Sequence, residues 1–403
     1  MLLDGTRIIS FCHFLLGPAA AQYLADMGAD VIKVEPVGGG YERHWSGARV
    51  FADGVSGFFL AANRNKRSIA LDLKHRDGLA VARRLIASAD VVMENFRPGV
   101  FERLGLGWEV LQSIKPDIIY ASASGYGPTG PLATKPGQDL LIQARSGLMS
   151  VNGGTERAPT AVGFAPCDQH GAALFALGIA GAVVRKLREG VGTRVEASLL
   201  NAGIDLQTES VVNWMTGRMQ PSRLRRQENL ATWFVQAPYG VYRTEDGKFV
   251  AISLNSIEAM AEALDDDHLR ALINIDVFEE RDRCAAAVAL AVGRYPANAI
   301  AERFDAAKLW WAPVMNYADV AADAQVAHNH ILEEVPVRGA SAVLVNHPNR
   351  YDGKVPPLRV LATEVGQHSR TILAELGYET ADIERLLAGG GVGAATEVAE
   401  AAS

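Results

Sequence analysis

Residues 7–35 read RIISFCHFLLGPAAAQYLADMGADVIKVE and contain three short elements in succession. Arg7 to Phe14 is β-branched and aromatic, Pro18 to Met27 has a helical pattern, and Ala29 to Glu35 is again apolar and β-branched. Strand, helix and strand in so short a stretch form a βαβ unit, whose two strands run parallel. Similar alternation continues to residue 123 and predicts an α/β fold with an open, doubly wound parallel sheet. Ligand sites in such sheets lie at the carboxyl ends of the strands.

Breaks in this pattern predict the domain limits. The polar, Arg-rich stretch PSRLRRQEN occupies residues 221–229, and Asp246-Gly247 lies between two alternating runs, as in a β-hairpin. We therefore expect a large Rossmann-like domain over 1–220, a smaller α+β domain over 221–315, a return to the large domain over 316–388 and a flexible tail over 389–403.

Composition excludes several classes of protein. The net charge of −7 over 403 residues gives no global basic field, so we expect no nucleic-acid partner. Cys12, Cys167 and Cys284 are far apart, without metal-ligand or disulfide spacing, and fit a reducing compartment. The sequence shows no secretory signal and no apolar run of about 18 residues, which predicts a cytoplasmic protein without a membrane partner.

The common nucleotide and hydrolase motifs are missing from the sequence. No Gly-x-Gly-x-x-Gly follows the first strand, and neither a Walker loop, a His-Glu-x-x-His pair nor a Gly-x-Ser-x-Gly elbow occurs. Carboxylates remain the best candidates for chemistry.

Asp168 stands out among the carboxylates. It lies in PCDQHG, residues 166–171, before an apolar run from Ala172 to Val184 that is typical of a buried helix and too short to span a membrane. Asp168 can therefore be a simple helix N-cap. Alternatively, helix amides hold it ionised in a site from which Gly, Ala and Leu residues exclude water, as a nucleophile or base requires.

Basic residues concentrate around two predicted strands. NRNKRS at 63–68 and Lys74-His75-Arg76 bracket the first, and ENFRPG at 94–99 with Arg103 follows the second. Such runs are often solvated faces. The aromatic and amide side chains after the second strand raise the alternative of a nucleotide pocket whose Lys and Arg side chains hold phosphates.

Several segments together resemble the class III coenzyme A transferases, the family of formyl-CoA transferase and carnitine CoA-transferase, over nearly the whole chain. They are LGP at 16–18, LADMGADVIKVE at 24–35, NKRSI at 65–69, ENFRPG at 94–99, GYGPTGP at 125–131 and GQHS at 366–369.

The resemblance implies a fold, a reaction and a set of site residues. The fold would be a large Rossmann-like domain made from both chain ends, a smaller domain between them, and two subunits interlocked as a homodimer. The enzyme would move CoA between carboxylic acids, with acyl-CoA and small acids as partners and no metal or nucleotide cofactor. Asp168 would attack the thioester and form an aspartyl-CoA thioester, and Asp139 would orient groups or handle protons, unless it only caps a helix. The coenzyme A site would be lined by His13, Leu71, Lys74, Asn95, Phe96 and Arg103.

Two departures and two rivals concern the substrate and the activity. Leu15 replaces a glutamine of formyl-CoA transferase, and the loop at 229–235 lacks its glycines, so we expect a larger dicarboxylate or similar acid, with succinyl-CoA as a candidate donor. An α-methylacyl-CoA racemase would use a His before the acid at position 139, where this chain has Gln138. Both carboxylates argue against a non-catalytic CoA-binding protein.

Overall fold

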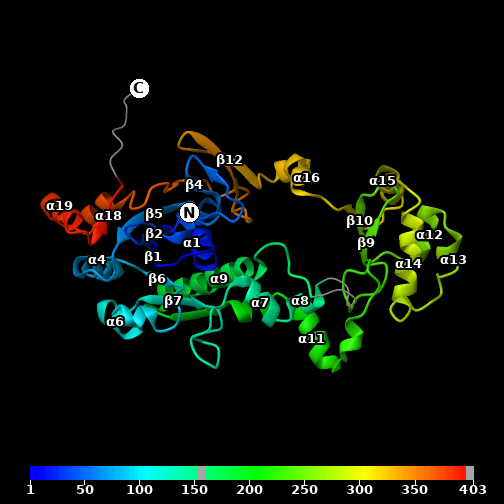
Figure 1. Ribbon diagram of the computed structural model, residues 1–403, viewed down its shortest axis with the longest axis horizontal. Coiled ribbons are helices and arrows are strands. Elements are labelled where there is room, and N and C mark those ends of the chain that lie inside the picture. The colour runs from blue at the N-terminus through cyan, green and yellow to red at the C-terminus, as the bar shows by residue number, and fades with distance from the viewer. Residues whose placement is uncertain (153–158, 396–403) are drawn as a thin grey trace. The chain divides into compact units, whose positions relative to one another are not determined.

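The computed structural model describes residues 1–152 and 159–395 and divides into two compact units (Figure 1). The first consists of Met1–Ile142, Ala165–Leu206 and the chain from Ala324 onward, and the second of Gln143–Phe164 and Gln207–Asp323. The second unit thus begins before and ends after the expected 221–315 domain, and it includes a segment expected in the large one. The Arg-rich break at 221–229 lies inside this unit because α11 (Thr208–Gly217) already belongs to it.

A seven-stranded sheet forms the centre of the first unit, in the order β14-β5-β2-β1-β6-β7-β8 (Figure 1). These strands are β1 (Arg7–Ser10), β2 (Asp30–Glu35), β5 (Lys66–Leu71), β6 (Val91–Glu94), β7 (Ile119–Ser124), β8 (Arg194–Ser198) and β14 (Val392–Gly393). Every neighbouring pair is parallel except β14 with β5. Without β14, the strand order is that of a Rossmann fold, and the predicted α/β class with a parallel-dominated sheet is confirmed.

Helices cover both faces of this sheet. On one face Leu85, Ile372 and Leu386 share a core cluster with the strand residues Ile9 and Ile32. They come from α4 (Arg76–Ala87), α18 (Ser369–Glu375) and α19 (Thr380–Ala388), which α6 (Trp108–Ile114) joins. On the other face, α1 (Leu16–Asp26) and α9 (Pro166–Glu189) pack on each other and on the strands.

Shorter elements complete the first unit. They are α2 (Tyr41–His44), β3 (Phe51–Ala52), β4 (Val55–Ser56), α3 (Gly57–Ala62), α5 (Val100–Arg103), α10 (Leu199–Asp205), α17 (Ala324–His328), β12 (Leu332–Val337) and β13 (Ala340–Val345), together with α7 (Asp139–Arg145), which begins there.

The expectation of a flexible tail from residue 389 is wrong for its first part. Val392 is 2% exposed, and it pairs antiparallel with Leu71 as β14. An apolar side chain that enters the core, beside an edge strand with open main-chain groups, explains this pairing. The remainder of the predicted tail, residues 396–403, lies outside the described residues.

The apolar run near Asp168 forms a longer helix than the sequence suggested. α9 extends from Pro166 to Glu189, 24 residues, so the expectation that it is too short to cross a membrane is wrong by length and composition. Residues such as Phe175 and Ile179 nevertheless face α1, α10 and the sheet and are buried. Length and composition alone also fit the core helix of a globular fold.

The second unit has its own core. A three-stranded antiparallel sheet, β11-β10-β9, packs with its helices around the fully buried Tyr242 and Phe304. Its remaining elements are α8 (Leu148–Val151), the 3-10 turn Pro221–Leu224, β9 (Gly240–Arg243), β10 (Phe249–Ile252), α12 (Ile257–Leu264), α13 (Asp267–Arg270), α14 (Arg281–Val292), α15 (Ala297–Ala306), β11 (Trp311–Pro313) and α16 (Tyr317–Ala322).

Candidate active site

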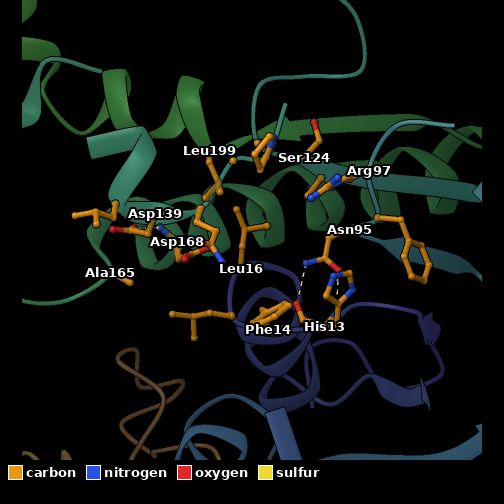
Figure 2. A pocket seen from close by; sticks show the side chains of 18 of the residues that line it. His13, Phe14, Leu16, Asn95, Arg97, Ser124, Asp139, Ala165, Asp168 and Leu199 are labelled. Atoms are coloured by element: carbon orange, nitrogen blue, oxygen red, sulfur yellow. Dashed lines mark hydrogen bonds between the residues drawn. The ribbon is translucent and has the colours of Figure 1, made fainter. Parts of the chain in front are cut away.

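A cavity opens where the order of the parallel strands reverses. β1 and β6 are neighbours there, and their carboxyl ends lead directly to Cys12-His13 and Asn95-Phe96. This is the place at which open α/β sheets bind ligands. The cavity measures about 770 Å³ (Figure 2). It is lined by residues 13–16, Tyr41, Trp45, Phe58, residues 95–98, 123–125, Ala133, residues 135–140, Ala165, Asp168 and Leu199.

Asn95 holds the loop that follows β1. Its Oδ1 accepts a hydrogen bond from the main-chain amide of His13 at 2.9 Å, and its Nδ2 donates to the carbonyl of His13 at 2.8 Å (Figure 2). Two bonds from one planar amide fix both sides of this residue. Asn95 therefore lies in the predicted site but shapes the protein loop, whether or not it also contacts a ligand.

Asp168 lies in the first turn of α9, at the cavity wall. The helix begins at Pro166 and its N-cap residue is Ala165, so the alternative that Asp168 is the N-cap is wrong. Its carboxylate accepts a hydrogen bond from the main-chain amide of Leu16, the first residue of α1. The side chain is therefore addressed by the start of one helix while it is carried by the start of another.

Asp139 lies beside Asp168. Its Oδ1 accepts the main-chain amide of Asp168 at 2.9 Å, so it satisfies one of the open amides at the start of α9 (Figure 2). Both predicted carboxylates thus meet in one cavity, and the capping alternative for Asp139 is realised on a helix other than its own. This contact orients the segment that carries Asp168.

The surroundings oppose a charge on Asp168. Burial, and next the negative charge of Asp139, raise the pKa of Asp168 from 3.8 to about 7, although the Leu16 amide acts in the opposite direction. The expectation that helix amides hold this carboxylate fully ionised is therefore wrong in its net direction, because desolvation outweighs the amide. A carboxyl group poised near neutral pH can still ionise, and poor solvation makes the ionised form reactive.

The predicted coenzyme A residues separate into three groups. His13, Asn95 and Phe96 line the cavity. Lys74 and Arg103 are exposed and lie outside its lining. The Leu71 side chain is 2% exposed within the core and pairs with β14, so it is not available to a ligand.

Part of the basic cluster serves the protein interior. Lys66 is buried and donates to the carbonyls of Pro18 and Ala62, and buried Arg64 pairs with Asp26 at 2.6 Å. Neither a solvated face nor a phosphate site describes these two cations. Their bonds instead tie β5 to α1 and α3.

Sequence reasoning missed most of the aromatic wall. Phe14, Tyr41, Trp45 and Phe58 line the cavity, and their rings form a chain with centroids 5.1–5.9 Å apart. These residues come from three separate segments, so no local spacing reveals them. Two exposed cations, Arg97 and Lys135, line the same cavity; Arg97 stood in the ENFRPG motif, whereas Lys135 carried no signal.

Glu94 supports the Phe96 segment from below. It accepts hydrogen bonds from the amide of Phe96 at 2.8 Å and the hydroxyl of Tyr120 at 3.0 Å. The Phe96 ring lies against His13 on one side and Phe101 on the other. The cavity wall is thus continuous with the aromatic core of the sheet.

Metal ligands do not gather in the part of the chain that the structure describes. Among residues 1–152 and 159–395, no group of three or more His, Cys, Asp or Glu side chains is arranged to hold a metal ion. The chemistry proposed below uses only carboxylate, amide and thioester groups.

A Rossmann-like sheet with a carboxylate pair in a cavity at its switch point defines an α/β enzyme that binds its ligand at the strand ends. Comparison with known sequences makes this class specific. The sequence model of CoA-transferase family III matches residues 3–369. This chain belongs to CoA-transferase family III, and the predicted class, an acyl-CoA:carboxylate CoA-transferase, is confirmed.

Named relatives agree with this assignment. An acyl-CoA transferase of Fusarium pseudograminearum is 33% identical over 95% of this chain and 86% of its own length. A succinyl-CoA:glutarate CoA-transferase of Mus musculus is 32% identical over 96% of this chain and 89% of its own. The crystal structure of a CAIB/BAIF family protein from Brucella suis superposes with a TM-score of 0.80 at 27% identity, covering 93% of this chain and 99% of that chain.

Proposed function

We propose that Asp168 is the nucleophile of this transferase and carries CoA as an aspartyl-CoA thioester. The observation that supports it is placement: Asp168 is a partly buried carboxylate at the wall of the strand-end cavity, hydrogen-bonded by the Leu16 amide. Its neighbour Asp139 fixes the main chain that carries it.

The chemistry consists of carboxyl exchanges. Ionised Asp168 attacks the thioester carbonyl carbon of the acyl-CoA; the C–S bond breaks, and a mixed anhydride and CoA thiolate form. The thiolate attacks the aspartyl carbonyl of the anhydride, releases the donor acid as its carboxylate and leaves Asp168 as a thioester. The acceptor carboxylate then repeats the sequence in reverse and leaves with CoA. Each step exchanges one activated carboxyl for another, so no ATP is consumed.

The protein groups at Asp168 fit this sequence. The Leu16 amide can donate to the oxyanion that develops on the aspartyl carbonyl, and a donor fixed at a helix start needs no reorganisation. Asp139 keeps the nucleophile in register through the amide of Asp168. We therefore assign Asp139 an orienting role.

Coenzyme A would extend along the aromatic and basic side of the cavity. We assign His13 and Phe96 to direct contact with the thioester arm, with Asn95 shaping the loop beneath it. The exposed cations Lys74 and Arg103 are assigned to its phosphates, for which Lys and Arg are suited.

A dicarboxylic acid is the proposed acceptor, with succinyl-CoA as donor. The mouse relative is named a succinyl-CoA:glutarate CoA-transferase. Arg97 and Lys135 line the cavity that holds Asp168, so the site offers cations for a second carboxylate as well as for CoA.

We further propose that the enzyme acts in the cytoplasm as an interlocked homodimer. In the first unit, α9 exposes Leu177 and Leu187 at 69% and 80%, an apolar stripe that a second subunit could cover. The cysteines Cys12, Cys167 and Cys284 are free and buried, as in a reducing compartment. Light scattering at several concentrations tests the dimer, and cell fractionation tests the compartment.

Trapping of the covalent intermediate tests the nucleophile. The enzyme is incubated with succinyl-CoA alone, treated with hydroxylamine or borohydride, and digested for peptide mass analysis. We expect modification of Asp168 and none in Asp168→Ala, which should fold but lose transfer by several orders of magnitude. Activity of Asp168→Ala within tenfold of wild type would refute the assignment.

The rival racemase activity is separated by a second measurement. A racemase exchanges the α-proton of a 2-methylacyl-CoA with solvent deuterium and leaves Asp168 unmodified. We expect the thioester and no such exchange, because Gln138 replaces the histidine that a racemase would use.

A further inference from the structure

A buried ion pair lies beneath the loop that leads to the nucleophile. Lys33 on β2 and Glu42 on α2 are 4% and 1% exposed, and Lys33 Nζ donates to Glu42 Oε1 at 2.8 Å. The same ammonium donates to the carbonyl of Cys12 at 2.9 Å. Burial opposes the charge on Glu42, but Lys33 outweighs it, so the pKa of Glu42 lies below its usual value and the pair is ionic.

The loop between β1 and α1 is held in an unfavourable conformation. Phe14 has φ of +60°, in the left-handed region that bulky L-residues rarely adopt. Such a residue persists only when its surroundings over-determine it, and these sites cluster where function needs them. Here the loop is fastened on both sides of Phe14's neighbour: Lys33 holds Cys12, and Asn95 holds His13 by two bonds.

Close packing prevents the loop from relaxing toward α1. A Cβ atom on Gly17 would lie 2.6 Å from Cβ and Sγ of Cys12, so only glycine permits this approach. α1 begins one residue earlier, at Leu16, whose amide reaches Asp168. The position of that amide is therefore fixed by the path of Cys12 and His13.

Stability alone does not account for the Lys33–Glu42 pair. Among the described residues, Glu42 Oε2 is buried without a hydrogen-bond partner of normal geometry. A buried ion pair with an unsatisfied oxygen is often no more stabilising than an apolar pair of similar volume. A neighbouring pair on the same two elements is better satisfied: Arg43 binds both oxygens of Glu35 at 2.7 Å.

We propose that Lys33 and Glu42 are positioning residues for the nucleophile. By holding the Cys12 carbonyl, the pair keeps the strained loop in the path that brings the Leu16 amide to Asp168. This inference rests on the proposed role of Asp168. Neither Lys33 nor Glu42 touches the substrate, and their effect passes through the loop.

The test compares two double variants. Lys33→Met with Glu42→Leu replaces the pair by apolar side chains of similar size. We expect a melting temperature equal to or above that of wild type, and a kcat lowered about tenfold or more, since small misplacements of reacting groups are costly. Glu35→Leu with Arg43→Met is the matched control. Arg43 holds carbonyls of residues 362–364 instead of the loop, so this control should lose stability and keep its kcat per folded enzyme.

The pH profile distinguishes positioning from general damage. The acidic limb of the rate reports ionisation of Asp168, which faces the Leu16 amide, Asp139 and the thiol of Cys167. Loss of the amide should move this limb to higher pH in the Met/Leu variant and leave it in place in the control. The conservative Glu42→Gln keeps an acceptor for Lys33 and should restore kcat to within about threefold of wild type.

Each outcome decides the matter. A Met/Leu variant with wild-type kcat and an unmoved limb would overturn the proposal. If that variant does not fold, Asn95→Ser removes the other fastening without leaving a buried charge and must give both changes; absence of both in it overturns the proposal equally. Absence of any Asp168 thioester in the wild type would instead refute the proposed function. A thioester that forms at the wild-type rate in the Met/Leu variant would refute only the positioning role.

Discussion

Replacement of Asp168 by asparagine should make the protein more stable while it abolishes transfer. The pKa of Asp168 rises from 3.8 to about 7. At about 1.4 kcal/mol per pKa unit this corresponds to about 4 kcal/mol of folding free energy. Partial solvent access and screening reduce it, and we expect about 2 kcal/mol.

The sign follows from the two pKa values. Below pH 3.8 the carboxyl is protonated in both the folded and the unfolded chain and costs nothing. Between about pH 4 and pH 7 the unfolded chain ionises while the folded chain resists, so the destabilisation grows. Above pH 7 it is constant. Asparagine has a similar shape and no charge, so the advantage of Asp168→Asn should follow the same curve.

Urea unfolding of wild type and Asp168→Asn at pH 5 and pH 8 measures this difference. The variant should gain more at pH 8 than at pH 5. Glu189→Gln is the control: this residue ends the same helix in an exposed pair with Arg185 and should show no comparable trend. An equal stability difference at both pH values, or a variant less stable than wild type at pH 8, would refute the electrostatic reasoning.

Three further predictions concern the same site. Asp139→Asn keeps an oxygen for the amide of Asp168 but removes its charge, so the acidic limb of kcat/KM should move down by about one pH unit; a profile between pH 5 and pH 9 checks this, and an unmoved limb contradicts it. Gly17→Ala places a methyl group against Cys12 and should cost about 1–3 kcal/mol in urea unfolding, with wild-type stability as the contrary result. Lys74→Ala should weaken CoA binding by calorimetry with little change in kcat, and unchanged affinity would remove Lys74 from the phosphate site.

The sequence allowed the sheet and much of the site to be predicted, because both follow from local patterns. The βαβ alternation predicted the parallel strands, and the motif segments placed His13, Asn95 and Phe96 at strand ends, where the structure brings them into one cavity. The pattern also singled out Asp139 and Asp168, although their roles remain predictions.

What escaped prediction depends on contacts between distant segments. Lys33 lies inside an apolar strand, and nothing in its spacing reveals that it reaches both Glu42 and the Cys12 carbonyl. The net rise in the pKa of Asp168 depends on how deeply the folded chain buries it, which no N-terminal helix signal reports. Val392, in a Gly-rich tail, becomes a strand only because β5 offers an open edge.

The pairing of β14 with β5 has a consequence for synthesis of the chain. During translation, β5 leaves the ribosome more than three hundred residues before its outer neighbour Val392 does. Until then, the nascent sheet presents an unpaired edge able to recruit strands from other chains. Chains that stop before residue 392 should therefore need chaperones more and aggregate more readily, even when every residue of the cavity has been made.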